Sequence, residues 1–225
     1  MLVQDLFFSF QGEGLLIGLP QVFLRLWGCN LSCEYCDEIS DHYQDLTTDA
    51  ILNKINEYLP KKPHSLVLTG GEPLLQVEDL KKLLPNIKLP IFLETNGTLP
   101  LHLTEIIDMV SFFSVDYKIG YEKEFIDFLF LINNKLAANI NTLKSQVYIK
   151  FVVLKDFNIL ELQKLVKIIN KINNKIPLVL QPVSITKKIK HQAKPEDLFR
   201  AYQIANKYLD DVRIIPQTHK FTGLK

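Results

Sequence analysis

Short apolar runs alternate with amphipathic segments along most of this chain. Most of the runs are nearly all apolar, which is typical of strands buried on both faces, as in parallel sheets. The segments between many of them place apolar residues at i, i+3 and i+4, the spacing of a helix with one buried face. This alternation predicts an α/β fold with a parallel sheet or barrel and right-handed crossovers. We expect strands at residues 22–27, 65–69, 90–94, 111–117, 147–153, 177–181 and 212–215, and helices at 47–59, 77–84, 122–136, 159–172 and 195–209.

Length and composition are those of one globular domain, which we expect to span residues 1–225. Apolar residues make up 47% of the chain, enough for a sizeable core. The 26 Lys and Arg residues nearly balance the 25 Asp and Glu residues, so the net charge of +1 gives no argument for a nucleic-acid or membrane partner. The N-terminus has no signal-peptide pattern, and no apolar run approaches the ~20 residues of a membrane span.

All three cysteines lie in one short run, Cys29, Cys33 and Cys36, with the spacing C-x3-C-x2-C. An odd, clustered set is poorly suited to disulfides, so a reducing cytoplasm and a metal centre are the better interpretation. A structural zinc ion is one possibility, with His42 or Asp37 as the fourth ligand. The other is an iron–sulfur cluster that takes only three iron ligands from protein and leaves one iron open for a small molecule. The lack of a second paired cysteine knuckle favours the cluster.

Polar motifs follow the ends of the predicted strands. In barrel-like α/β folds the carboxyl ends of the strands form the active face, so polar groups gathered there indicate a site. The cysteines follow the first predicted strand. The later motifs are TGGEP at 69–73, ETNGT at 94–98, DYK at 116–118, LQPV at 180–183 and PQTHK at 216–220.

The cysteine spacing after one strand and GGEP after the next together resemble the radical S-adenosylmethionine (SAM) superfamily. The resemblance implies that the three Cys hold a [4Fe–4S] cluster and that the amino and carboxylate groups of SAM chelate the fourth iron. Tyr35, just before the last Cys, would pack near the adenine. Gly70 and Gly71 let the backbone approach a ligand, and Glu72 offers a carboxylate to its ammonium group. The residues that could complete the SAM site are Ser114, Asp116, Lys118 and Gln181.

The N-terminal half narrows this resemblance to the 7-carboxy-7-deazaguanine synthase family of 7-deazapurine (queuosine) biosynthesis. The similar motifs are FQGEG, FLRLWGC, TGGEPLLQ, ETNGT, SVDYK, LQPV and PQTHK, which lie between residues 7 and 222. The family implies a partial or modified parallel (β/α)6 radical-SAM barrel, usually a homodimer, with 6-carboxy-5,6,7,8-tetrahydropterin as substrate. It also implies Mg²⁺, an electron donor such as a flavodoxin or ferredoxin, and a reaction in which the pterin ring contracts and ammonia leaves.

The pterin presents a 2-amino group and an N3–H side by side. A carboxylate can accept a charge-assisted hydrogen bond from each of these donors. Glu13 is our candidate, although QGEG could instead be a glycine loop with an exposed Glu. Arg25 is the only charge in its apolar strand and could bind the substrate carboxylate bidentately, or form a buried ion pair. The other residues that we assign to the substrate are Phe10, Gln11, Gly12, Thr69 and Lys225.

One position departs from the family pattern. After the last Cys the family reads Asp then Ser or Thr, whose hydroxyl is a Mg²⁺ ligand, whereas this chain reads Asp37-Glu38. Glu38 is a competent hard oxygen ligand, with Ser40 as a fallback, so either Glu38 holds the metal or the metal site is altered or lost. Two other functions stay open from the residues: a glycyl-radical activase, which would share the cysteine and GGEP motifs, and a non-catalytic zinc-binding module.

Overall fold

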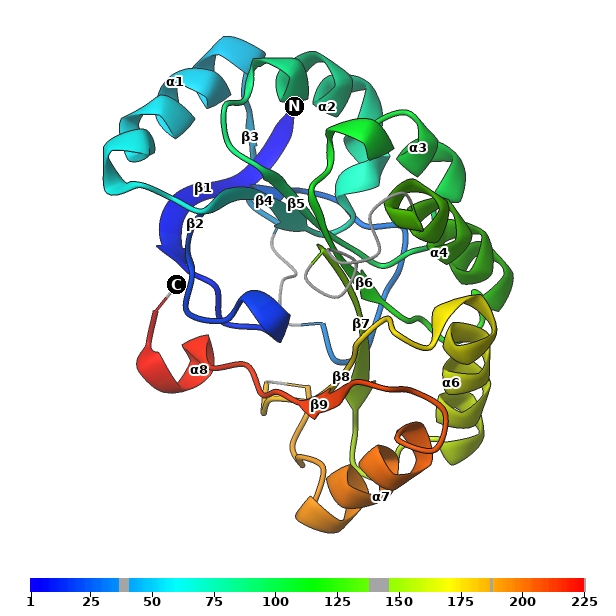
Figure 1. Cartoon of the computed structure of the whole chain (residues 1–225). Coiled ribbons are helices and arrows are strands. Elements are labelled where there is room, and N and C mark those ends of the chain that lie inside the picture. Colours follow the sequence, from blue (N-terminus) through cyan, green and yellow to red (C-terminus); the bar gives the residue numbers. More distant parts are fainter. Residues whose placement is uncertain (37–40, 138–145, 187, 225) are drawn as a thin grey trace.

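The computed structural model describes residues 1–36, 41–137, 146–186 and 188–224. The described strands form one nine-stranded sheet in the order β3-β1-β2-β4-β5-β6-β7-β8-β9. Its strands are β1 Leu2–Phe10, β2 Pro20–Leu26, β3 Gln44–Asp45, β4 Ser65–Gly70, β5 Ile91–Thr95, β6 Phe112–Asp116, β7 Val147–Val153, β8 Leu178–Pro182 and β9 Val212–Ile214. Every neighbouring pair from β2 to β9 is parallel, whereas β1 runs antiparallel to both β2 and β3. The expected α/β fold with a partial parallel barrel is confirmed, since the curved sheet remains open between β3 and β9 (Figure 1).

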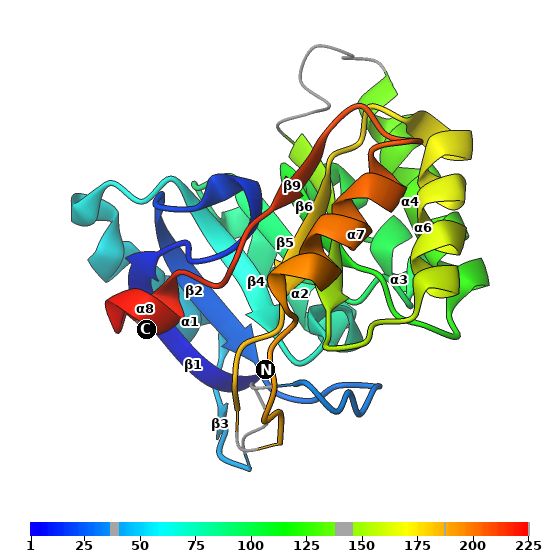
Figure 2. The same cartoon turned by 90° about the horizontal axis from the view of Figure 1, so that it is seen from below.

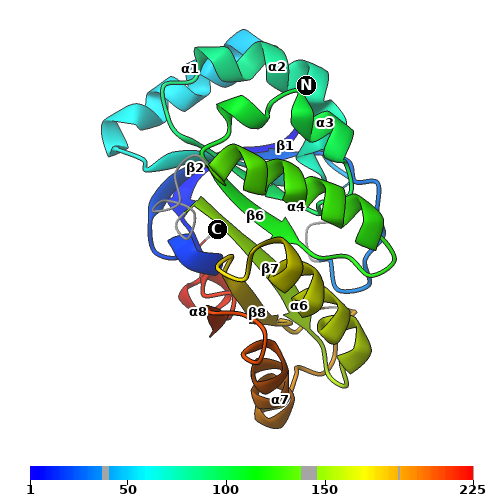
Figure 3. The same ribbon diagram turned by 45° about the vertical axis from the view of Figure 1, so that its right-hand side comes forward.

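Helices cover the outer, convex side of this sheet (Figure 1, Figure 3). They are α1 Thr48–Tyr58, α2 Val77–Leu83, α3 Pro100–Thr104, α4 Glu122–Leu136, α6 Ile159–Asn173 and α7 Pro195–Ala205, with short 3-10 turns η1 Gly14–Leu16, η2 Leu59–Lys61, η3 Pro73–Gln76, η4 Leu84–Asn86 and η5 Ile107–Met109. The last helix, α8 His219–Thr222, lies apart from them, next to β1 and β2 (Figure 2). In the described part of the chain, no helix combines the length and apolar character needed to cross a membrane.

Side-chain caps fix where two of these helices begin. The Thr47 hydroxyl accepts a hydrogen bond from the Ala50 N–H at 3.2 Å at the start of α1. The Asn158 side chain accepts from the Leu160 N–H at 3.0 Å at the start of α6. Such caps satisfy backbone donors that the first helical turn leaves without a partner. The sequence signal for α1, a Thr before an acidic first turn, therefore reflects a real local interaction.

The two faces of the sheet carry different side chains, because successive residues of a strand point to opposite faces. One set, which includes Leu24, Leu68 and Phe113, packs under the helices in the main core. The other set forms a smaller apolar layer on the concave face: Phe7, Phe23, Val67, Phe92, Tyr148 and Val179. The concave face is therefore apolar along this layer, and the polar side chains of the site lie next to it.

The N-terminal strand β1 was missing from the sequence prediction, which began the sheet at residue 22. Polar residues interrupt its apolar pattern, and its register against β2 shifts between Val3 and Asp5. The expected helix at 195–209 is also too long, since α7 ends at Ala205. The first error matters for the site, because β1 carries the chain into the QGEG segment that borders the cavity.

The packing under the helices gives a direct stability prediction. Leu68 on β4 is fully buried in the main core, and Leu68→Ala should lower the free energy of unfolding by about 2–5 kcal/mol, because a cavity replaces the lost side chain. Leu101→Ala on α3 is the matched control, since Leu101 is 79% exposed and its truncation should cost less than ~0.5 kcal/mol. Urea denaturation of both variants measures the difference. Equal losses would contradict this assignment of the core.

Candidate active site

A cavity of about 450 Å³ lies at the carboxyl ends of the parallel strands on the concave face, a size typical of small-molecule sites. Many residues predicted from the sequence line it: Phe10, Gln11, Gly12, Glu13, Arg25, Cys29, Cys33, Tyr35, Cys36, Thr69, Gly71, Asp116, Lys118 and Gln181. Glu72 and Ser114 are fully buried beside it and are absent from its lining. The predicted ligands Glu38 and Lys225 lie outside the described residues, as do Asp37 and Ser40.

The three cysteine thiols line one end of this cavity. The Cys36 N–H donates to the Cys33 carbonyl at 3.2 Å, and the Leu31 N–H donates to Cys29 Sγ at 3.4 Å. Burial raises the pKa of the Cys29 thiol, and the nearby charges of the other two cysteines raise it further. Bound iron would reverse this repulsion, because it holds thiolates in their charged form.

Three thiols at one end of a cavity are a donor set that suits an iron–sulfur cluster. In the described ranges, no three His, Cys, Asp or Glu side chains gather closely enough to hold a single ion. A [4Fe–4S] cluster places each cysteine on a different iron, so its thiolates need not converge on one point. The residues present therefore fit the cluster that the sequence predicted.

The GGEP turn packs directly against the backbone that leads to Cys29. The Gly71 N–H donates to the Leu26 carbonyl at 3.1 Å, and the Glu72 N–H donates to the Gly28 carbonyl at 2.8 Å. A Cβ on Gly71 would lie 1.9 Å from the Gly28 oxygen, and Gly70 has φ +121°. Only glycine permits this approach and this backbone conformation, so the turn fixes the start of the cysteine loop.

Glu72 is directed into the protein and away from the cavity lining. Its carboxylate accepts from the Thr95 hydroxyl at 2.9 Å, the Asn96 N–H at 2.7 Å and the Leu74 N–H at 3.1 Å. Burial raises the pKa of Glu72 to about 7, although these donors oppose the shift. In this structure Glu72 therefore joins the GGEP turn to the ETNGT turn, and its expected contact with a ligand ammonium remains a prediction.

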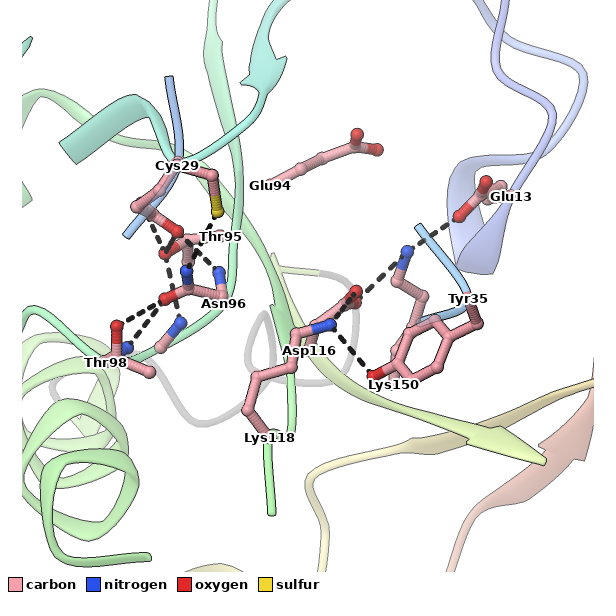
Figure 4. Close-up of polar contacts among 12 residues, drawn as sticks. Glu13, Cys29, Tyr35, Glu94, Thr95, Asn96, Thr98, Asp116, Lys118 and Lys150 are labelled. Carbon is pink, nitrogen blue, oxygen red and sulfur yellow. Dashed lines mark hydrogen bonds and ion pairs between the residues drawn. The ribbon is translucent and has the colours of Figure 1, made fainter. Parts of the chain in front are cut away.

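The ETNGT turn also supports the cysteine loop through hydrogen bonds to the residue after Cys29 (Figure 4). The Asn96 side-chain amide donates to Asn30 Oδ1 at 2.9 Å and lies 3.9 Å from Cys29 Sγ. The Asn30 amide donates to the Thr98 hydroxyl at 2.8 Å, and that hydroxyl donates to Asn96 Oδ1 at 2.7 Å. This closed network holds the residue after Cys29, so Asn96 supports the loop that carries the first cysteine.

A chain of alternating charges crosses the middle of the cavity (Figure 4). Lys150 Nζ lies 2.7 Å from Glu13 Oε2 and 3.1 Å from Asp116 Oδ1. Lys118 Nζ lies 3.3 Å from Asp116 Oδ2 and donates to the Tyr35 hydroxyl at 3.3 Å. Burial opposes the charges of both lysines, but the carboxylates raise the pKa of Lys118 and of Lys150. Both lysines therefore remain charged at neutral pH.

Glu13 is a constrained anion rather than the exposed loop residue that we kept as an alternative. Gln217 Nε2 donates to Glu13 Oε1 at 2.7 Å, and the Glu13 N–H donates to Gln11 Oε1 at 3.1 Å. Burial opposes its charge, yet the Lys150 ammonium and the Gln217 amide hold the pKa of Glu13 at about 2. The carboxylate is thus oriented and charged before any ligand binds.

A second carboxyl group, Glu94, lines the cavity beside it. Thr69 Oγ1 donates to Glu94 Oε2 at 2.8 Å, and Gln11 Nε2 donates to Glu94 Oε1 at 3.0 Å. Burial raises the pKa of Glu94, in contrast to Glu13. Two carboxyl groups whose pKa values are driven apart are the usual arrangement of an acid and a base in one site. Arg25 lies over the Phe7 ring at 5.5 Å, at the same side of the cavity.

One acceptor in the lining is unsatisfied. Gln181 is only 5% exposed, and no donor among the described residues reaches its Oε1 atom. A buried polar atom without a partner costs free energy, so its presence in a cavity wall is a reason to expect a ligand donor there.

Sequence reasoning missed three residues of this site: Glu94, Lys150 and Gln217. Lys150 had a usable signal, since it is the only charge in the apolar strand 147–153, the same signal that identified Arg25. Glu94 falls at the end of a predicted strand, in the ETNGT motif that we noted, but we did not assign this acid to the site. Gln217 lies in the PQTHK motif that we noted, but its role was not identified, because its contact with Glu13 joins positions 204 residues apart.

The fold and the three-cysteine cavity define a radical SAM enzyme, and the family model described as the radical SAM superfamily matches residues 27–177. Curated relatives include the 7-carboxy-7-deazaguanine synthases of Geobacter sulfurreducens, 34% identical over 98% of this chain and 96% of the relative, and of Methanocaldococcus jannaschii, 31% identical over 99% of this chain and 100% of the relative. The chain belongs to the 7-carboxy-7-deazaguanine synthase family. The crystal structure of QueE from Escherichia coli has the same fold, with a TM-score of 0.64 and 20% identity over 97% of this chain and 94% of that chain.

The glycine contact predicts a defect in cluster binding. Gly71→Ala places a methyl group against the Gly28 carbonyl, so the cysteine loop must move, and iron bound per chain after anaerobic reconstitution should fall by at least about half. Gly18→Ala is the control: its φ of +83° adds strain, but a Cβ there meets nothing within 4 Å. That variant should lose some stability and bind iron fully. Full iron content in Gly71→Ala would contradict the proposed role of the turn.

The buried carboxyl group of Glu72 predicts a pH-dependent stability. The folded state holds this proton more tightly, so the stabilisation is complete below the ordinary pKa of 4.5 and is lost as pH rises to about 7. Relative to Glu72→Gln, the free energy of unfolding of the cluster-free wild type should fall by roughly 3 kcal/mol across this window, at ~1.36 kcal/mol per pKa unit. Urea denaturation at a series of pH values measures it, and a difference that stays constant with pH would refute the shift.

Proposed function

We propose that this protein converts 6-carboxy-5,6,7,8-tetrahydropterin to 7-carboxy-7-deazaguanine, with ring contraction and loss of ammonia. Glu13 is the observation that carries the proposal. It is an ionised carboxylate with a pKa of about 2, held by Lys150 and Gln217 in the same cavity as the three cysteines. Such an anion matches the adjacent 2-amino and N3–H donors of a pterin. A cavity of about 450 Å³ also favours a small molecule over the protein substrate of a glycyl-radical activase.

The cysteine end of the cavity would hold the cluster and SAM. Cys29, Cys33 and Cys36 would bind the [4Fe–4S] cluster, which together with SAM supplies the radical that takes a hydrogen from the substrate. Asp116 can accept from SAM hydroxyl groups, and the unsatisfied Gln181 Oε1 can accept from another of its donors. Tyr35, with Lys118 5.2 Å from its ring centroid, offers an aromatic face beside Cys36.

The opposite end would hold the pterin. Glu13 would accept from the 2-amino and N3–H groups, and the Arg25 guanidinium would bind the substrate carboxylate. Glu94, whose pKa is raised by burial, holds a proton more readily than Glu13 and faces the same space. It is therefore the group best able to exchange a proton with the substrate, while Thr69 and Gln11 fix its two oxygens.

Further properties of the proposal rest on the sequence resemblance. We infer one catalytic domain over residues 1–225, a homodimer, a cytoplasmic location, and reduction by a flavodoxin or ferredoxin. We also infer Mg²⁺ bound by Glu38, a residue outside the described ranges, because a carboxylate is a hard oxygen ligand.

An anaerobic assay tests the proposal. The reconstituted and reduced enzyme, given SAM, Mg²⁺ and 6-carboxytetrahydropterin, should release 7-carboxy-7-deazaguanine, detected by mass spectrometry. Glu13→Gln should weaken pterin binding by roughly 30-fold or more, because loss of a buried charged partner typically costs ~2–5 kcal/mol. SAM binding measured without pterin should change little.

Glu34→Gln is the matched control, since the same change is made at an exposed residue that does not line the cavity. It should leave pterin affinity unaltered. The proposed function would be overturned if wild-type enzyme with a full cluster made no product. It would also be overturned if Glu13→Gln bound the pterin as tightly as wild type.

A further inference from the structure

Lys150 occupies an unusual position for a lysine. It lies in the middle of β7, is 7% exposed, and pairs in register with Asp116 on the neighbouring strand β6. Lysine is almost never this buried unless its charge is compensated. Here the compensation comes from Asp116 and from Glu13, a residue 137 positions away in the sequence. The fold thus brings one ammonium group between two carboxylates that are far apart in the sequence.

The two carboxylates belong to opposite ends of the cavity. Glu13 is oriented by Gln217 and forms the pterin end. Asp116 also contacts Lys118, which donates to the Tyr35 hydroxyl at the cysteine end. Lys150 therefore links the two proposed ligand sites, because it forms an ion pair with a carboxylate at each end (Figure 4).

We propose that Lys150 is a positioning residue that couples the two ends, so that SAM and the pterin each raise the affinity of the enzyme for the other. This inference rests on the proposed function, which assigns Glu13 to the pterin and Asp116 to SAM. A coupling carried by one shared group must be reciprocal, because the four binding steps form a closed thermodynamic cycle.

SAM is expected to raise the affinity for the pterin, rather than lower it, because Asp116 and Glu13 share the Lys150 ammonium. When SAM hydroxyl groups donate to Asp116, they satisfy part of that carboxylate, and Lys150 is freer to pair with Glu13. Glu13 is then held more firmly before the pterin arrives, so less ordering remains for pterin binding.

Binding without turnover tests the coupling. The anaerobic holoenzyme, with its cluster oxidised and no reductant present, is titrated with SAM by calorimetry in the presence of Mg²⁺, with and without saturating 6-carboxytetrahydropterin. Wild-type enzyme should bind SAM about tenfold more tightly with the pterin present, within the usual range of such couplings. In Lys150→Met this ratio should fall to about one.

Lys118→Met is the matched control. Its truncation also removes an ion pair to Asp116, but the other partner of Lys118 is the Tyr35 hydroxyl, whereas the ammonium paired with Glu13 is that of Lys150. Whatever its SAM affinity, Lys118→Met should keep most of the tenfold ratio. If circular dichroism shows that Lys150→Met does not fold, Lys150→Gln, which retains two N–H donors but no charge, replaces it with the same expectation.

Three results would overturn the coupling: a wild-type ratio of one, an undiminished ratio in the Lys150 variant, or an equal loss in both lysine variants. The last would mean that removing either cation simply weakens the site. Failure of the pterin to bind wild-type enzyme is a different result, because it overturns the proposed function together with the coupling. If wild-type enzyme binds and converts the pterin but shows no gain in SAM affinity when the pterin is present, only the coupling is overturned.

Discussion

On the concave face, an apolar side chain of each central strand is followed two residues later by a side chain that lines the cavity. The pleat imposes this spacing, since every second residue shares a face. Arg25 follows Phe23, Thr69 follows Val67, Glu94 follows Phe92, Lys150 follows Tyr148 and Gln181 follows Val179. The register of the strands then brings Arg25 beside Thr69 and Lys150 beside Asp116. A layer of charges is thereby built on a layer of closely packed apolar side chains.

That apolar layer explains the electrostatics of the site. Charged groups next to an apolar layer are poorly stabilised by water. Each therefore needs an ion-pair or hydrogen-bond partner, or its pKa shifts towards the neutral form. Glu13 pairs with Lys150 and stays ionised, whereas Glu94 accepts hydrogen bonds from the neutral Thr69 and Gln11 side chains and burial raises its pKa. The same constraint leaves Lys150 shared between two acids. Separate acid, anion and cation roles therefore arise in one small cavity from the placement of a few strands.

Much of the fold and part of the site could be predicted from local sequence. The seven runs that we expected as strands are β2 and β4 to β9, and the helix at 122–136 coincides with α4, because apolar periodicity and caps are local properties. The cysteine spacing and the lone charge of Arg25 also stand out locally. The PQTHK motif was noted, but the role of Gln217 within it could not be predicted, since that role depends on a contact with Glu13 that only the folded chain creates. Glu72 shows the opposite case: its motif was recognised, but its burial under the ETNGT turn depends on tertiary packing.

The central claim is that one cavity holds the cluster and SAM at its cysteine end and the pterin at its Glu13 end. A crystal structure of the anaerobic holoenzyme with SAM and 6-carboxytetrahydropterin tests this claim most directly. We predict a [4Fe–4S] cluster on Cys29, Cys33 and Cys36, with the pterin 2-amino and N3–H groups on Glu13 and its carboxylate on Arg25. A single zinc ion among the thiols, or a pterin bound outside this cavity, would contradict it.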